Sequence, residues 1–197
     1  MEAAAPAMPA FEWYAVIDPT APLEQGDLLL NFPIPILAPT FTDQIPAEGA
    51  AANLPGEIKS FDVIVMTQSC DFAKLTDTDD IVLCPHNDYF EVIKVHPELG
   101  KGSWKPLLEG RRIGICLIDR CRIAGHEFDY RLVSLQQIFT VPLGAVRRFA
   151  ARQMRVRLLP PYREYLAQAF AKQFMRVGLP IDLPREFPTP AKYSRLD

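Results

Sequence analysis

Proline is the residue that most restricts how this chain can fold. Nineteen prolines are spread over its 197 residues. Each one fixes its own φ and lacks an amide donor, so it interrupts helices and central strands. The apolar runs between the prolines are short and rich in β-branched residues, which favour strands where length does not decide. The sequence therefore predicts many short strands and excludes long helices from most of the chain.

Six segments are predicted as strands, and they follow one another without helical segments between them. That order favours antiparallel pairing through hairpins over parallel βαβ units. The expected fold is mainly β, of the α+β class: a small antiparallel barrel or bent sheet with a C-terminal helix and a proline-rich tail. The predicted strands are residues 27–31, 61–67, 80–84, 89–95, 112–118 and 130–135.

The clearest helix is predicted late in the chain. Two prolines at 160 and 161 open it, and Gly178 closes it. Its apolar residues recur every four positions, so one face is expected to pack on the sheet and the other to meet solvent or a partner. These apolar residues are Tyr162, Leu166, Phe170 and Phe174. A weaker helix is predicted within residues 143–154.

The chain is long enough to bury one core, and a single domain with appendages is predicted. Residues 1–22, rich in Ala and Pro, are predicted as an N-terminal arm, and residues 23–140 as the β-barrel domain. Residues 141–178 are predicted as a helical extension packed on the barrel. Residues 179–197 form the proline-rich tail, which either lies across its own domain or docks into a partner.

The expected location is the cytoplasm. No apolar run approaches the roughly 20 residues that a membrane-spanning helix needs, so no membrane association is predicted, and no targeting segment opens the chain. The four cysteines lie in or beside apolar runs, where cysteine is usually a reduced, buried residue. They are Cys70, Cys84, Cys116 and Cys121.

Charge is divided unevenly along the chain. Residues 1–100 hold 16 acids, three lysines and no arginine, whereas residues 101–197 hold 18 Lys and Arg against 8 acids. Either the two halves neutralise each other within one fold, or the basic half binds an acidic partner, protein or RNA. Arginine suits carboxylate and phosphate recognition. The predicted binding residues are Arg147, Arg148, Arg152, Arg155, Arg157, Arg163 and Arg176.

The most distinctive string is VIVMTQSCDF, an apolar strand that ends abruptly in polar residues. Its polar end, residues 67–71, is either a catalytic or binding lip or a turn that uses Ser and Asp for local backbone hydrogen bonds. Cys70 and His86 invite a thiol nucleophile and base, with Asp88 orienting the imidazole. Asp71 works against this, because a neighbouring negative charge raises the thiol pKa.

Metal binding is a further alternative, because five potential zinc ligands exceed the four that a closed site requires. They are Cys70, Cys84, His86, Cys116 and Cys121. No CxxC pair is present, and phosphate loops and nucleophile-elbow motifs are missing. No metal and no cofactor is predicted.

Three consecutive segments resemble the PemK/MazF-like toxins: GDLLLNF at 26–32, FDVIVMTQSCDF at 61–72 and DIVLCPHND at 80–88. The resemblance covers the first half of the chain and implies an SH3-like barrel with sequence-selective RNA cleavage. The family uses an arginine before the second strand and a Ser or Thr soon after the proline of the third. Here Lys59 stands without an arginine, and His86 and Asn87 follow Pro85, so the expected pair is absent.

The function predicted from these features is a non-catalytic protein-interaction or regulatory module. The resemblance implies a subunit of a prokaryotic toxin–antitoxin or antiviral defence system, with a protein partner that contacts the basic C-terminal half. One alternative is an endoribonuclease in which His86 acts as acid or base and Lys59 stabilises the phosphorane. The acidic N-terminal half argues against it. A second alternative is a cysteine/histidine enzyme. The candidate catalytic residues are Lys59, Cys70, Asp71 and His86.

Overall fold

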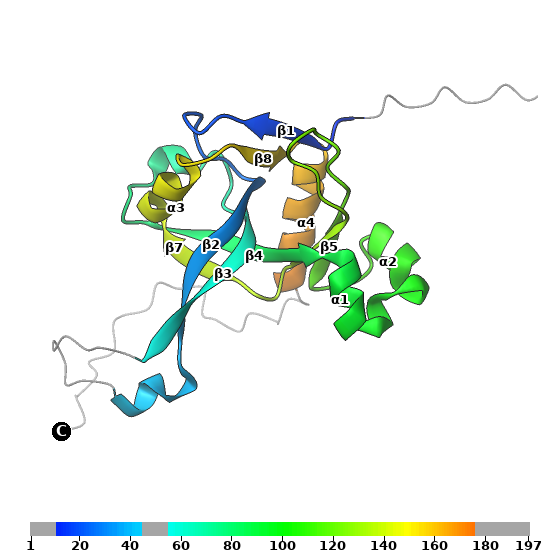
Figure 1. Cartoon of the computed structure of the whole chain (residues 1–197), viewed down its shortest axis with the longest axis horizontal. Helices are drawn as coiled ribbons and strands as arrows, with labels where there is room; N and C mark the ends of the chain where they lie inside the picture. Colours follow the sequence, from blue (N-terminus) through cyan, green and yellow to red (C-terminus); the bar gives the residue numbers. More distant parts are fainter. Residues whose placement is uncertain (1–10, 45–54, 176–197) are drawn as a thin grey trace, which may run out of the picture.

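A computed structural model describes residues 11–44 and 55–175. Within them, eight strands form one antiparallel sheet in the order β1-β8-β2-β3-β4-β6-β5, and β7 also pairs with β4 (Figure 1). The strands are β1 Tyr14–Ile17, β2 Asp27–Leu37, β3 Gly56–Val65, β4 Asp80–Asp88, β5 Ile115–Ile118, β6 Arg131–Ser134, β7 Phe139–Pro142 and β8 Arg155–Leu158.

All four α-helices follow β4 in the sequence, and the earlier part of the described chain has only short 3₁₀ turns. The α-helices are α1 Tyr89–Val95, α2 Trp104–Leu108, α3 Leu143–Ala150 and α4 Tyr162–Phe174. The 3₁₀ turns are η1 Pro39–Gln44, η2 Phe72–Lys74, η3 Pro97–Leu99 and η4 Lys101–Ser103. The α+β class and both predicted C-terminal helices are thereby confirmed, with α3 ending earlier than expected.

The central part of the sheet is buried on both faces, which explains the uninterrupted apolar runs of its strands. Along β3, Ile64 points into a core that includes Leu166 of α4, whereas Val63 and Val65 point into a second core that includes Val146 of α3. All three β3 residues are fully buried. A third, smaller cluster joins α1 and α2 to β5 and β6.

The predicted strand at residues 89–95 is wrong, because this segment forms α1. Asp88 caps the helix by accepting hydrogen bonds from the backbone N–H groups of Phe90 (2.8 Å) and Glu91 (3.2 Å). An N-terminal aspartate of this kind satisfies amide groups that the first helical turn leaves free. Tyr89 packs against the Trp104 ring of α2 at 5.3 Å between ring centroids. The partial alternation of the segment concealed this helical packing.

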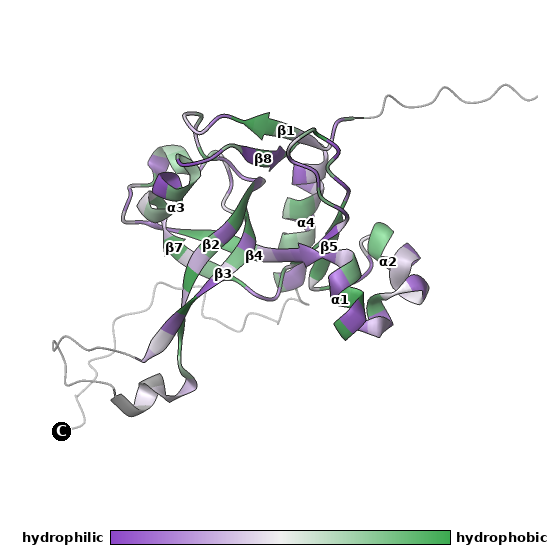
Figure 2. Ribbon diagram, viewed as in Figure 1, coloured by the Kyte–Doolittle hydropathy of each residue, from purple (hydrophilic) through white to green (hydrophobic). Residues whose placement is uncertain are grey.

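Strands also lie in segments where none was predicted. The N-terminal arm contains β1, which pairs with β8 along its whole length, from Tyr14 opposite Leu158 to Ile17 opposite Arg155. β8 itself lies inside the predicted helical extension, between β1 and β2. Figure 2 shows β8 in the hydrophilic colour although its four residues are buried. The arginines of β8 therefore require partners inside the fold.

β2 is longer than predicted and continues through two prolines to Leu37. Beyond Phe32, β3 is its sole partner among the residues that the structure describes, and the two strands leave the body of the molecule as a twisted ribbon (Figure 1). Along the described residues, no helix has the length and apolar character needed to cross a membrane. The predicted proline-rich tail and Arg176 lie outside the described residues.

Candidate functional site

A buried ion cluster holds β8 in the sheet. Asp27 is fully buried, and Arg155 and Arg157 are 3% and 8% exposed. Arg155 Nε donates to Asp27 Oδ2 at 2.8 Å, and both Nε and Nη2 of Arg157 donate to the same carboxylate. The prediction that places these two arginines on a partner-facing surface is wrong. Their charge is neutralised inside the fold, since a buried charge is tolerated only when it is paired and hydrogen-bonded.

Backbone carbonyls complete the cluster. Arg155 Nη2 donates to the carbonyls of Ala21 and Pro22, both at 2.8 Å, and Arg157 Nη2 donates to Pro22 at 2.7 Å. Burial alone would lower the pKa of Arg157, but the hydrogen bond and charge of Asp27 outweigh burial, so that pKa is raised. The two arginines thus also hold the loop that precedes β2.

The other predicted arginines lie nearer the surface. Arg163 is 22% exposed in its side chain and pairs with Glu24 at 3.6 Å and with Glu164 at 3.0 Å. Arg147 pairs with Asp77 across an exposed contact of 2.7 Å. Arg148 and Arg152 are exposed and have no ion-pair partner among the described residues. Of the predicted arginines that the structure describes, Arg148 and Arg152 alone are free to meet an external charge.

The structure does not assemble the four candidate catalytic residues. Lys59 lies on the ribbon near the start of β3 and pairs with Glu57 at 2.8 Å. Cys70 and Asp71 follow the other end of the strand, and the six residue steps from Lys59 to Val65 alone span about 20 Å. A joint action of Lys59 and Cys70 on one substrate atom is thereby excluded.

His86 is placed unfavourably for proton transfer to a substrate. It is 1% exposed, and neither ring nitrogen has a hydrogen-bond partner among the described residues. Burial, assisted by the nearby charge of Arg131, lowers the pKa of His86 to about 4, although Asp62 acts in the opposite direction. Asp88 is occupied in capping α1 and does not orient the imidazole. His86 is therefore a neutral core residue at pH 7.

The polar turn after β3 serves the backbone. Thr67 Oγ1 accepts the amide of Val82 at 2.8 Å, and Ser69 Oγ accepts the amide of Gln25 at 3.1 Å. These bonds tie the turn to β4 and to the loop before β2. The exposed Cys70 lies 3.9 Å from the Asp71 carboxylate, with no base in contact. Of the two interpretations of this turn, the structural one agrees with these contacts.

The potential zinc ligands do not form a site in the described part of the chain. No group of three or more His, Cys, Asp or Glu side chains comes together there. Burial raises the pKa of Cys84 and of Cys116 to about 12, which opposes the thiolate that zinc requires. Cys121 is likewise buried, and its pKa is raised by burial.

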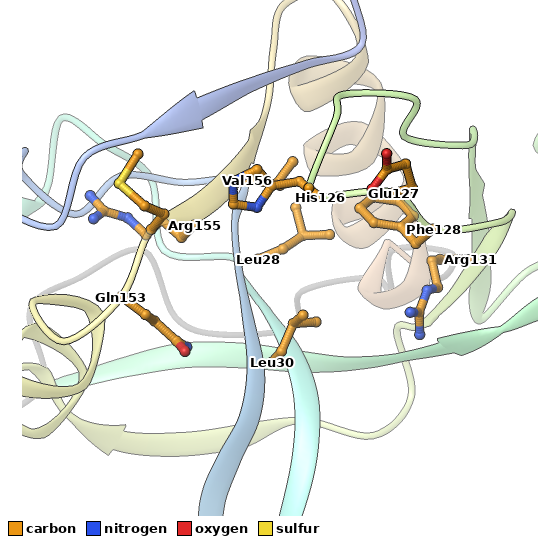
Figure 3. A pocket seen from close by; sticks show the side chains of 11 residues that line it. Leu28, Leu30, His126, Glu127, Phe128, Arg131, Gln153, Arg155 and Val156 are labelled. Carbon is orange, nitrogen blue, oxygen red and sulfur yellow. The ribbon is translucent and has the colours of Figure 1, made fainter.

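A small pocket of about 220 Å³ opens beneath the loop at residues 125–128 (Figure 3). Leu28 and Leu30 contribute apolar surface to it, and Figure 3 shows the guanidinium of Arg155 turned away from both. Arg131 lines one side, but it is paired with Asp62 at 3.2 Å. None of the four candidate catalytic residues lines this pocket.

A larger apolar groove, of about 370 Å³, runs between α3 and the outer part of β2. Phe32 and Phe149 meet edge to face in its wall, with ring centroids 4.9 Å apart. Pro33 and Pro35 contribute apolar surface from β2, and Val141, Pro142 and Ala145 contribute it from β7 and α3. The remaining lining residues are Arg148 and Arg152. The two unpaired arginines therefore stand beside an apolar surface.

Comparison with known protein families, with curated proteins and with solved structures finds no match for this chain. The resemblance to PemK/MazF-like toxins therefore stays a prediction. The structure gives a physical reason for Gly26 and Asp27, the first two residues of the segments that carry this resemblance. Gly26 adopts φ +88°, which glycine tolerates best, and this turn delivers Asp27 to the buried arginines.

Sequence reasoning missed the ion cluster although two signals were present. Asp27 opens an apolar strand, where a buried acid requires cationic partners. The segment RVRL at 155–158 alternates charged and apolar residues with the period of a strand. The groove had no comparable signal, because its walls come from residues 32–35 and 141–152, which only the tertiary fold brings together.

Proposed function

We propose that this protein is a non-catalytic interaction module whose α3–β2 groove binds an acidic, partly apolar segment of a partner protein. The observation that supports it best is the position of two arginines without ion-pair partners, Arg148 and Arg152, in the lining of an apolar groove. In line with the resemblance, the sheet is interpreted as an SH3-like barrel and the partner as another component of a toxin–antitoxin or antiviral defence system.

The groove suits a peptide better than a small ligand. It is open and mostly apolar, with prolines on one side and the Phe149 ring on the other. Apolar anchors of a bound segment can pack there, while its carboxylates approach Arg148 and Arg152 from the rim. Aromatic and arginine side chains carry much of the energy of protein interfaces.

The arrangement of the catalytic candidates supports a binding role over catalysis. A nuclease or thiol enzyme requires its acid, base and nucleophile within hydrogen-bond reach of one reacting centre. Here His86 is buried and neutral, and Lys59 lies about 20 Å from Val65, the end of β3 that Cys70 follows. The acidic residues of the N-terminal half further disfavour a nucleic-acid substrate.

The test is an affinity capture from the native host with three tagged proteins, followed by mass spectrometry and RNA sequencing. The wild type is expected to retain one stoichiometric partner with an acidic segment. The double variant Arg148→Glu/Arg152→Glu is expected to lose it, because both favourable contacts become repulsive. Arg122→Glu, an exposed arginine outside the groove, is the matched control and is expected to retain it.

Two results would contradict the proposal. If the double variant retains the same partner as the wild type, the groove is not the binding surface. If the wild type instead retains RNA with uniform cleaved ends, and purified protein reproduces those ends, the chain is a nuclease. In that case Lys59→Ala should abolish the cleavage if Lys59 stabilises the phosphorane, whereas cleavage by a contaminating nuclease would persist.

A further inference from the structure

One edge of β3 is unpaired along the ribbon. β4 pairs with β3 only at Val63, Ile64 and Val65. Among the described residues, the earlier part of β3 pairs with β2 alone. Residues 56–60 are all exposed, and the ribbon extends away from the body of the molecule (Figure 1). The N–H and C=O groups on this edge are therefore available to another strand.

The prolines of β2 decide which ribbon edge can accept a strand. Pro33 lies opposite Ser60, and Pro35 lies opposite Ile58. A proline cannot donate to a neighbouring strand, so in an alternating antiparallel ladder these two positions face away from β3. The outer edge of β2 is thereby blocked. By the same alternation, the polar backbone groups of Ile58 and Ser60 face the open edge of β3.

The sequence at this edge is complementary to itself. In an antiparallel pair centred on Ile58, Ile58 lies opposite its own copy, and Gly56 lies opposite Ser60 of the second copy. These are the positions whose backbone groups face outward, so both strands offer donors and acceptors in register. The same register places Glu57 opposite Lys59 in both directions.

Side chains distinguish this register from its neighbour. A pair centred on Lys59 would set two lysines opposite each other, which destabilises a strand pair. Centring on Ile58 instead joins two Glu57–Lys59 ion pairs, each 2.8 Å within its own chain, into a group of four alternating charges. It also covers Ile58, which is 75% exposed in the single chain.

We propose that a second copy of this chain pairs with the open edge of β3, antiparallel and centred on Ile58, to form a symmetric dimer with a sheet continuous across it. None of residues 56–60 lines the α3–β2 groove, so the two surfaces share no residue. Two modules held in this way present two grooves to a partner, and bivalent binding strengthens attachment without new contacts.

Sedimentation velocity over a range of concentrations tests the proposal. The wild type is expected to shift from one to two chain masses as concentration rises. Glu57→Lys alone and Lys59→Glu alone are each expected to weaken the dimer about tenfold or more, because each places like charges opposite each other across the interface. A monomer at every concentration would overturn the proposal.

Complementation makes the test specific. An equimolar mixture of the two single variants restores opposite charges across the interface, so a heterodimer is expected. The double variant Glu57→Lys/Lys59→Glu is expected to dimerise with itself. Lys105→Glu, on an exposed lysine of α2, is the matched control and is expected to dimerise like the wild type. A dimer that neither single variant weakens, or that mixing does not restore, uses another surface and overturns the proposal.

Discussion

Arginines from one short stretch of sequence have opposite environments in this protein. Arg155 and Arg157 lie on β8 and are buried against Asp27, whereas Arg148 and Arg152 lie at and just beyond α3 and face solvent. All four look alike in the sequence. Their difference arises because one pair belongs to a strand inside the sheet, whereas the other belongs to an exposed helix face and the turn that follows it. Charge density along a chain therefore does not locate a binding surface.

The largest loss of stability is expected when the buried ion pairs of Arg155 and Arg157 are broken. Asp27→Ala leaves the buried Arg155 without a carboxylate and Arg157 with Glu24 alone. Removal of one partner from a buried pair costs about 3–5 kcal/mol. Urea unfolding at pH 7 measures this loss. Glu91→Ala, which removes the exposed pair with Lys94, is the control and should cost less than about 1 kcal/mol. Equal losses would mean that burial does not distinguish the two pairs.

A pH-dependent effect of similar size is expected from His86, a buried ionisable residue without a charged partner in hydrogen-bond contact. Its folded pKa of about 4 lies below the ordinary value of 6.5, because burial disfavours the charged ring. The fold is therefore favoured above pH 6.5 and loses stability as the pH falls toward 4. The slope is about 1.4 kcal/mol for each pH unit.

Urea unfolding of His86→Leu between pH 7 and 4 measures the contribution of this residue. The variant should show a shallower loss of stability than the wild type. His96→Leu, which changes an exposed histidine, is the matched control. If His86→Leu and the wild type lose stability in parallel, burial of His86 is not the cause.

A moderate effect is expected at Gly26, the turn that delivers Asp27 to the buried arginines. A Cβ there would lie 2.9 Å from the carbonyl oxygen of Leu158 at φ +88°. Strain of this kind costs about 1–3 kcal/mol. Gly26→Ala should therefore lower the free energy of unfolding, as thermal and urea unfolding would report. Gly102→Ala, with open space around the new Cβ, should change it little.

The smallest effect on stability is expected when the two exposed arginines, Arg148 and Arg152, are changed. Arg148→Glu/Arg152→Glu should change the free energy of unfolding by no more than about 0.5 kcal/mol, because both side chains are solvated. The same variant should abolish partner capture. Destabilisation by several kcal/mol would show that these arginines, like those of β8, hold the fold together.

Much of the fold was predictable because its pattern is local. Three of the predicted strands, including residues 61–67, lie within or overlap the central strands, and two prolines marked the start of α4. β8 was not recognised because four residues with two arginines resemble a surface segment until a buried acid is placed beside them. The apolar residues of 89–95 follow neither the alternation of a strand nor the 3.6-residue repeat of a helix clearly. In the structure, Asp88 caps this segment as a helix.

Less of the candidate site was predictable. The basic stretch includes Arg148 and Arg152, but the sequence gave no means of separating them from Arg155 and Arg157. The groove depends on Phe32 and Phe149, which are 117 positions apart in the chain and meet only in the fold. The burial that keeps His86 neutral likewise depends on contacts between strands that are distant in the sequence.

A double-mutant cycle between Asp27 and Arg157, followed by urea unfolding at pH 7, tests most directly whether the basic stretch is divided between core and surface. The account predicts that Asp27→Asn and Arg157→Gln each destabilise strongly and that the double variant loses about 2 kcal/mol or more less than their sum. Small, additive losses would contradict it, because they would mean that these charges are not coupled inside the fold.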